Sequence, residues 1–121
     1  MADPSAGAPL VPMLRVRVSG DTVALDLAVA NPDAAAVQVT FSSSQRYDFV
    51  VLDESGTEVW RWSADRMFSQ ALSEEEVPAG AVLEYHEVWP EAVAGTFRVV
   101  ASFESTNHPL ELTAEFVVPE G

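Results

Sequence analysis

The feature that most constrains the fold is a pair of β-prone segments joined by a tight turn, at residues 47–63. Both segments are rich in β-branched and aromatic residues, and the turn between them ends in Gly56, which can adopt the positive φ that closes a hairpin. The first segment is apolar at successive positions, which is typical of a strand covered on both faces. The second carries Trp60 and Trp62 on one face, and so much aromatic area is expected to be buried. We therefore predict that this hairpin lies at the centre of the core.

Alternation of apolar and polar residues predicts further strands on both sides of the hairpin. They are expected at residues 14–18, 23–29, 37–41, 82–89, 97–103 and 110–118. In the strand at 82–89 the phase is irregular, and a bulge would let both Tyr85 and Val88 point inward. About eight strands joined by short turns, with almost no helix and no internal repeat, indicate an all-β fold: an immunoglobulin-like antiparallel β-sandwich.

The remaining segments lack strand alternation. Within residues 63–71 a single helical turn is expected, because Phe68, Ala71 and Leu72 fall at helical spacing. The acidic run at 73–76 is expected to be a solvated connector. Residues 1–12 contain neither a cationic start nor an apolar run, so we expect a disordered tail there, no secretory signal or membrane anchor, and one domain over residues 13–119.

The charge composition excludes two classes of partner. Nineteen acidic residues face six basic residues, all arginine, which gives a net charge of −13. Such a surface repels nucleic acid and anionic membranes, so neither is expected to bind. An acidic surface without lysine is also typical of a halophile protein, because high salt screens the repulsion between carboxylates. A GC-rich genome that favours arginine would produce the same composition, and both explanations remain open.

The sequence contains no arrangement of residues that predicts catalysis. There is no cysteine, which removes disulfides, thiol nucleophiles and thiolate metal sites. The two histidines, His86 within a strand and His108 before a proline, have neither metal-ligand spacing nor a nucleophile-elbow serine beside them. No glycine-rich phosphate loop follows a strand, and the acidic run lacks the spacing of a calcium loop. We therefore expect no enzyme activity, no metal and no cofactor, and an outward-facing His86.

The central stretch resembles a known family. It combines Tyr-Asp-Phe-Val-Val, a turn with glycine, Glu-Val-Trp-Arg-Trp-Ser and the apolar pairs at 67–68 and 71–72. Matching pieces follow at residues 78–80, 87–89 and 94–99. Together they resemble the BsuPI-type intracellular proteinase inhibitor domain over roughly residues 12–118. The resemblance implies a cytoplasmic, monomeric inhibitor whose partner is a serine protease of the subtilisin type.

A protease inhibitor of this kind needs a displayed loop. A rigid sandwich can hold a loop extended so that the protease pairs with it as a strand. The leading candidate follows the tryptophan-rich segment and consists of Asp65, Arg66, Met67 and Phe68. Met67 is expected to be exposed, whereas Phe68 could either enter a specificity pocket or pack against one end of the sandwich. Two further loops are secondary candidates, with Asn31, Pro32, Asp33, Asn107 and His108.

Other interpretations stay open. Asp48 is expected to be structural, either capping a turn or pairing with an arginine such as Arg61, because a covered carboxylate must be hydrogen-bonded. A non-inhibitory immunoglobulin-like protein-binding or assembly module, which uses a sheet face or edge, would have the same fold. A small-molecule binder would additionally require a cleft.

Overall fold

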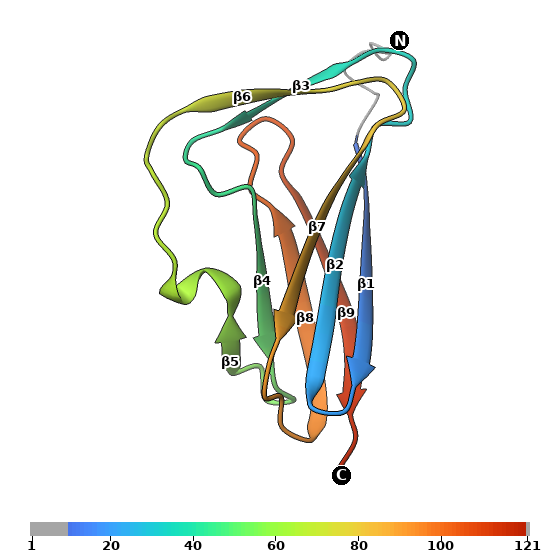
Figure 1. Cartoon of the computed structure of the whole chain (residues 1–121), viewed down its shortest axis with the longest axis vertical. Coiled ribbons are helices and arrows are strands. Elements are labelled where there is room, and N and C mark those ends of the chain that lie inside the picture. Colours follow the sequence, from blue (N-terminus) through green and yellow to red (C-terminus); the bar gives the residue numbers. More distant parts are fainter. Residues whose placement is uncertain (1–9, 121) are drawn as a thin grey trace.

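The computed structural model describes residues 10–120, which form nine strands and one short 3-10 helix. The strands form three antiparallel sheets, with the orders β1-β2-β7, β3-β6 and β5-β4-β8-β9. Figure 1 shows the two larger sheets as facing layers and the β3-β6 ribbon across one end. The predicted β-sandwich is therefore confirmed. The elements are β1 (Val11–Ser19), β2 (Thr22–Ala30), β3 (Val37–Phe41), β4 (Tyr47–Leu52), β5 (Glu58–Arg61), η1 (Trp62–Asp65), β6 (Ser73–Val77), β7 (Val82–Trp89), β8 (Gly95–Phe103) and β9 (Leu110–Val118).

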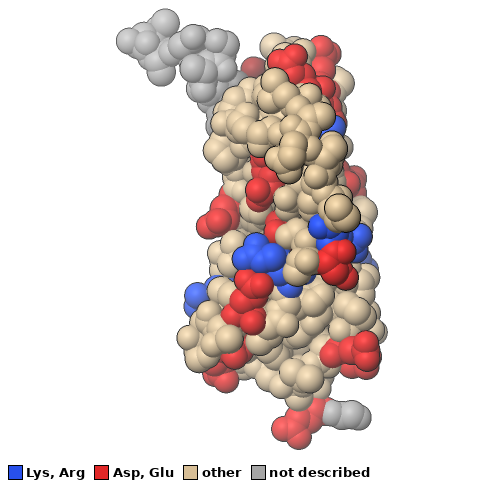
Figure 2. Space-filling view, turned by 90° about the vertical axis from the view of Figure 1, so that its left-hand side faces the viewer, with Lys and Arg blue, Asp and Glu red and all other residues tan. Residues whose placement is uncertain are grey.

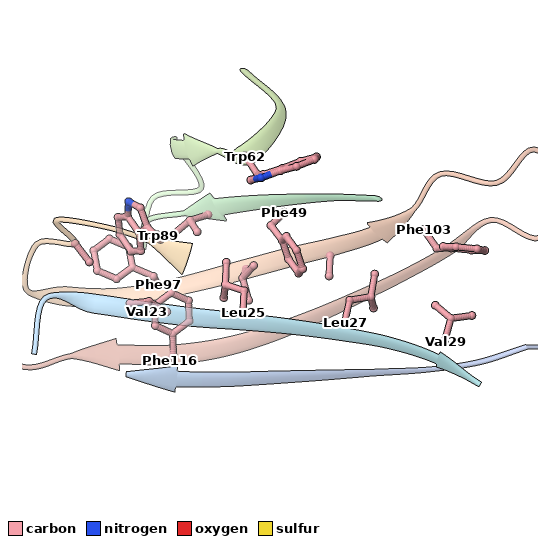
Figure 3. Packing of buried hydrophobic residues seen from close by; sticks show 14 of the residues in the cluster. Val23, Leu25, Leu27, Val29, Phe49, Trp62, Trp89, Phe97, Phe103 and Phe116 are labelled. Atoms are coloured by element: carbon pink, nitrogen blue, oxygen red, sulfur yellow. The ribbon is translucent and has the colours of Figure 1, made fainter. Parts of the chain in front are cut away.

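The core lies between the two larger sheets. Its clearest row is the inward face of β2, where Val23, Leu25, Leu27 and Val29 are at most 2% exposed. Figure 3 shows this row packed with aromatic side chains from the opposite sheet. Strict alternation along β2 produces this burial, because side chains of successive strand residues point to opposite faces.

The central hairpin forms, but its second strand β5 lies at the edge of the sheet and ends at Arg61, so Trp62 belongs to η1 and does not share a strand face with Trp60 as expected. Gly56 closes the turn with a φ of 87°, and β4 lies between β5 and β8 in its sheet. Phe49 and Val51 are fully buried, but the alternating residues Val50 and Leu52 are partly exposed. The expectation that β4 is covered on both faces is therefore wrong. β4 is central because both of its edges are hydrogen-bonded.

Two further expectations, for β7 and for the acidic run, are wrong. β7 has no bulge, so Tyr85 and Glu87 face inward and Val88 faces outward. The inward Glu87 is accommodated because its carboxylate accepts a hydrogen bond from the Tyr47 hydroxyl. The acidic run expected to be a connector forms β6, which pairs with the edge of β3. Ladder hydrogen bonds use backbone groups, so an available edge can recruit a segment with weak strand propensity.

The bounds of several segments also differ from those predicted. Leu10 is 3% exposed and β1 begins at Val11, so the folded part starts before residue 13. Residues 1–9 of the expected tail lie outside the described residues. The expected helical turn exists as η1, but it ends at Asp65, and Leu72 is 72% exposed instead of packing at helical spacing. Within residues 10–120, no helix has the length and apolar character needed to cross a membrane.

Candidate functional site

Residues 66–72, called here the Met67 loop, join η1 to β6 along one side of the sandwich (Figure 1). The backbone leaves η1 in an extended conformation, with φ −119° and ψ 155° at Arg66. The next side chain, Met67, is 97% exposed, as predicted from the sequence. Phe68 is partly buried and packs against the core cluster, which resolves the open choice for this residue in favour of packing. The loop therefore presents one large apolar side chain to solvent.

The residue before Met67 is held by three contacts. The Arg66 backbone N–H donates to the Ser63 carbonyl at 3.2 Å, and Arg66 Nε donates to the Trp62 carbonyl at 3.2 Å. The guanidinium also lies over the Trp62 ring, 4.4 Å from its centroid, in a cation–π contact. Arg66 is thus attached to η1 through both its backbone and its side chain.

The residues after Met67 are held by different partners. The Phe68 ring lies against the Trp62 ring, with 5.8 Å between centroids. The Ser69 N–H donates to Ser44 Oγ at 2.9 Å, and the Ser44 N–H donates to the Ser69 carbonyl at 2.9 Å. Met67 therefore stands between two anchored positions, and Trp62 contributes to both anchors.

Trp62 is itself the outer member of a stack of aromatic rings. Its ring stacks on Tyr47 at 4.5 Å, and Tyr47 stacks on Tyr85 at the same distance. Tyr85 in turn lies 6.3 Å from Phe103 in the core. Figure 3 shows Trp62 at the margin of the buried cluster, beside β4. The Met67 loop is thus supported by a continuous aromatic column that begins inside the sandwich.

The tyrosines of the column are kept neutral by their surroundings. Burial raises the pKa of Tyr85 to about 12, because the anionic form would lose solvation. Burial and the hydrogen bond to Glu87 also raise the pKa of Tyr47 far above its ordinary value. Both hydroxyls therefore stay protonated near neutral pH.

Asp48 ties η1 to the central strand. It is 5% exposed, and its carboxylate accepts hydrogen bonds from Ser63 Oγ at 2.6 Å, from the Ser63 N–H at 3.2 Å and from Arg61 Nη1 at 3.3 Å. The Phe49 N–H donates to it as well. The expected structural role and the pairing with Arg61 are both confirmed. Asp48 fixes the base of the Met67 loop.

The first secondary loop, which joins β2 to β3, does not expose the Asn31 side chain to solvent. This side chain is 1% exposed, and its Nδ2 donates to the carbonyls of Ala35, Val77 and Pro78 at 2.9–3.2 Å. The expectation of a displayed Asn31 is therefore wrong, while Pro32 is exposed and Asp33 is partly exposed. Figure 1 shows this β2–β3 connection at the opposite upper corner from the Met67 loop, so the two loops do not form one surface.

The other secondary loop is bound to the edge of β3. Asn107 Nδ2 donates to the Gln38 carbonyl at 3.0 Å, and Asn107 Oδ1 accepts from the Thr40 N–H at 2.9 Å. This amide replaces the next strand of a ladder, and Asn107 remains exposed. His108 is partly buried. Sequence reasoning missed both asparagine roles because Val77, a partner of Asn31, and Thr40, a partner of Asn107, lie 46 and 67 residues away.

The described residues contain no other arrangement with chemical function. His86 faces outward, as predicted, and its Nδ1 lies 2.7 Å from Asp26 Oδ1. No group of three or more metal-ligating side chains occurs in the described part of the chain. A surface hollow of about 540 Å³ beside Ser42, Ser102 and Glu104 is open and lined mainly by polar groups. This geometry does not favour a small-molecule site, which is normally concave and mostly apolar.

A family model described as intracellular proteinase inhibitor matches residues 10–108, which include the Met67 loop and the aromatic column. The chain belongs to the BsuPI family. The match ends before β9, although β9 pairs with β8 along its whole length. A family of intracellular proteinase inhibitors implies a protease partner and a non-enzymatic function. No curated protein matches the chain.

Two solved structures that are similar to this BsuPI-family chain are parts of much longer proteins. A penta-heme cytochrome c552 from Thermochromatium tepidum is 12% identical, with a TM-score of 0.56, over 94% of this chain and 40% of that one. A β-glucosidase 3B from Thermotoga neapolitana is 15% identical, with a TM-score of 0.49, over 92% and 16%. The chain spans less than half the length of either protein. At such identity the first likeness shows a common fold alone.

Proposed function

We propose that the chain is a cytoplasmic, monomeric inhibitor of a subtilisin-type serine protease and that the Met67 loop occupies the active site of that protease. The observation that carries the proposal is the exposure of Met67, at 97%, between two anchored positions. Family membership supports a protease as the partner.

The anchored loop suits recognition by a protease. Arg66 already has the extended backbone that lets an enzyme pair with the segment as an added strand. Because Arg66, Phe68 and Ser69 are held by the scaffold, less conformational entropy is lost on binding. The unbranched Met67 side chain fits an apolar specificity pocket of irregular shape.

The charge distribution also favours the Met67 loop as the place where a partner binds. The six residues 67–72 carry no charge, in a chain whose net charge is −13. Figure 2 shows the side of the molecule that carries the loop, where uncharged surface lies beside a group of arginine side chains with acidic side chains next to them. The centres of protein interfaces are depleted of charged residues, because burying an unpaired charge is costly. The loop segment 67–72 itself therefore brings no charge into an interface.

The test compares two charge substitutions in one loop. Met67→Glu places a carboxylate where the apolar pocket would be, so we expect the inhibition constant for a subtilisin-type protease from the same cell to rise about 100-fold. Leu72→Glu is the matched control, since Leu72 is also exposed but lies beyond the anchored part. Both variants should melt like the wild type. Equal inhibition by wild type and Met67→Glu, or no inhibition by stoichiometric wild type, would refute the proposal.

A second candidate is a non-inhibitory module that binds a protein through the outer face of the β1-β2-β7 sheet. That face carries four exposed apolar side chains: Val11, Met13, Val82 and Val88. Recovery of a stoichiometric non-protease partner, lost in the Met13→Glu variant and retained in Met67→Glu, would favour this function.

A further inference from the structure

The Met67 loop divides the chain so that every sheet contains strands from both sides of it. Strands β1 to β5 precede the loop and β6 to β9 follow it. The three sheets nevertheless pair β2 with β7, β3 with β6, and β4 with β8. Figure 1 shows the loop passing outside these pairs along one side of the sandwich. A break in the loop would therefore leave all the strand pairs intact.

From this topology we infer that Met67–Phe68 is a cleavage site for the inhibited protease, and that the nicked chain stays assembled and remains an inhibitor. The inference rests on the proposed function. The protease supplies the catalytic groups and water supplies the new atoms: hydrolysis breaks the bond between the Met67 carbonyl carbon and the Phe68 nitrogen. It leaves a carboxylate on Met67 and a protonated amine on Phe68, and the reverse reaction expels water.

The bond is placed where a protease can reach it. Met67 is 97% exposed, and the residue before it is extended. Proteases bind their substrates as extended strands, and exposed loop segments are the preferred sites of nicking. The fixed flanks make this segment a good ligand, and they also keep the scissile bond in place once the enzyme is bound.

The two new ends would stay close to each other after the cut. Arg66 remains attached through the Ser63 and Trp62 carbonyls and the Trp62 ring. Phe68 remains against the same Trp62 ring, and Ser69 remains bonded to Ser44. Because both ends are held on one ring, their effective concentration is high, which favours resealing of the bond over escape.

The two fragments share most of the core. The strand pairs between them contain eight residue pairs for β2 and β7, five for β3 and β6, and six for β4 and β8. Aromatic contacts between the fragments are Phe41–Phe103 at 5.5 Å, Tyr47–Tyr85 at 4.5 Å and Trp60–Trp89 at 6.5 Å. Separation would expose all of this apolar surface to water, so the nicked chain is expected to remain one folded unit.

The experiment treats the intact protein with a catalytic amount of subtilisin and follows the products by mass spectrometry after acid quenching. We expect a single cut that gives fragments 1–67 and 68–121. The two fragments should coelute on a sizing column in native buffer. The purified nicked protein should inhibit within about tenfold of the intact chain. Incubations begun from intact and from nicked protein should converge on the same ratio of the two forms.

The outcomes separate this inference from the proposed function. Full inhibition without any cut at Met67–Phe68, or a cut followed by separation of the fragments, would overturn the inference and leave the loop as an inhibitor. A cut that occurs while substrate cleavage proceeds unslowed would overturn the proposed function. Ser44→Ala provides a second measurement, because it removes the acceptor for the Ser69 N–H. It should accelerate the loss of inhibition several-fold relative to the control Ser42→Ala, and equal rates would count against the role of the anchors.

Discussion

Removal of the Phe68 ring tests whether anchoring of the loop is what makes it an inhibitor. The ring is partly buried and lies 5.8 Å from that of Trp62. Phe68→Ala should remove about 0.5–1.5 kcal/mol of aromatic contact. It should also remove about 1 kcal/mol of hydrophobic burial, since the side chain is only partly covered. If this free energy of about 2 kcal/mol must be supplied again when the protease orders the loop, the inhibition constant rises by up to about 30-fold.

The assay for this prediction combines steady-state inhibition of a subtilisin-type protease with amide hydrogen exchange. Exchange in residues 66–72 should accelerate, while β4 and β8 remain protected, because Phe68 packs on the outer member of the aromatic column. Leu72→Ala is the matched control, since Leu72 is 72% exposed and loses little contact. An unchanged inhibition constant in a variant with faster loop exchange would refute the reasoning. Loss of protection in β4 would refute the local role of Phe68.

Two further predictions concern stability. Asp48→Ala leaves the Ser63 N–H and hydroxyl and the Arg61 guanidinium without their acceptor, so the free energy of unfolding in urea should fall by about 3 kcal/mol; a fall below about 1 kcal/mol would contradict the assigned role. For His86, the hydrogen bond to Asp26 raises the pKa above its ordinary 6.5. Folding thus favours the protonated form, so its stabilisation is complete below pH 6.5 and is lost as pH rises through the folded pKa. The stability difference between wild type and His86→Gln should shrink over that range, and a difference that grows with pH would contradict the pairing.

Local alternation of apolar and polar residues was enough to predict most strands. β3 and β9 have the bounds that alternation predicts, Val37–Phe41 and Leu110–Val118. The exposure of Met67 and the structural role of Asp48 were also predicted, because each follows from residue type and neighbours. Pattern failed for β6, whose acidic residues become a strand only because β3 offers an unpaired edge.

The amino-acid sequence thus determined the fold class, since period-two alternation and turn residues act over a few positions, and its central stretch carried the resemblance to the family that suggested the candidate loop. Only the tertiary structure decided how the loop is held. Ser44 meets Ser69 across 25 residues, and Asn31 meets Val77 across 46, through hydrogen bonds that no local pattern encodes. A polar side chain can be exposed to solvent or hydrogen-bonded to the backbone of distant strands. Which of the two occurs depends on which distant backbone groups lack partners, and only the assembled sheets decide this.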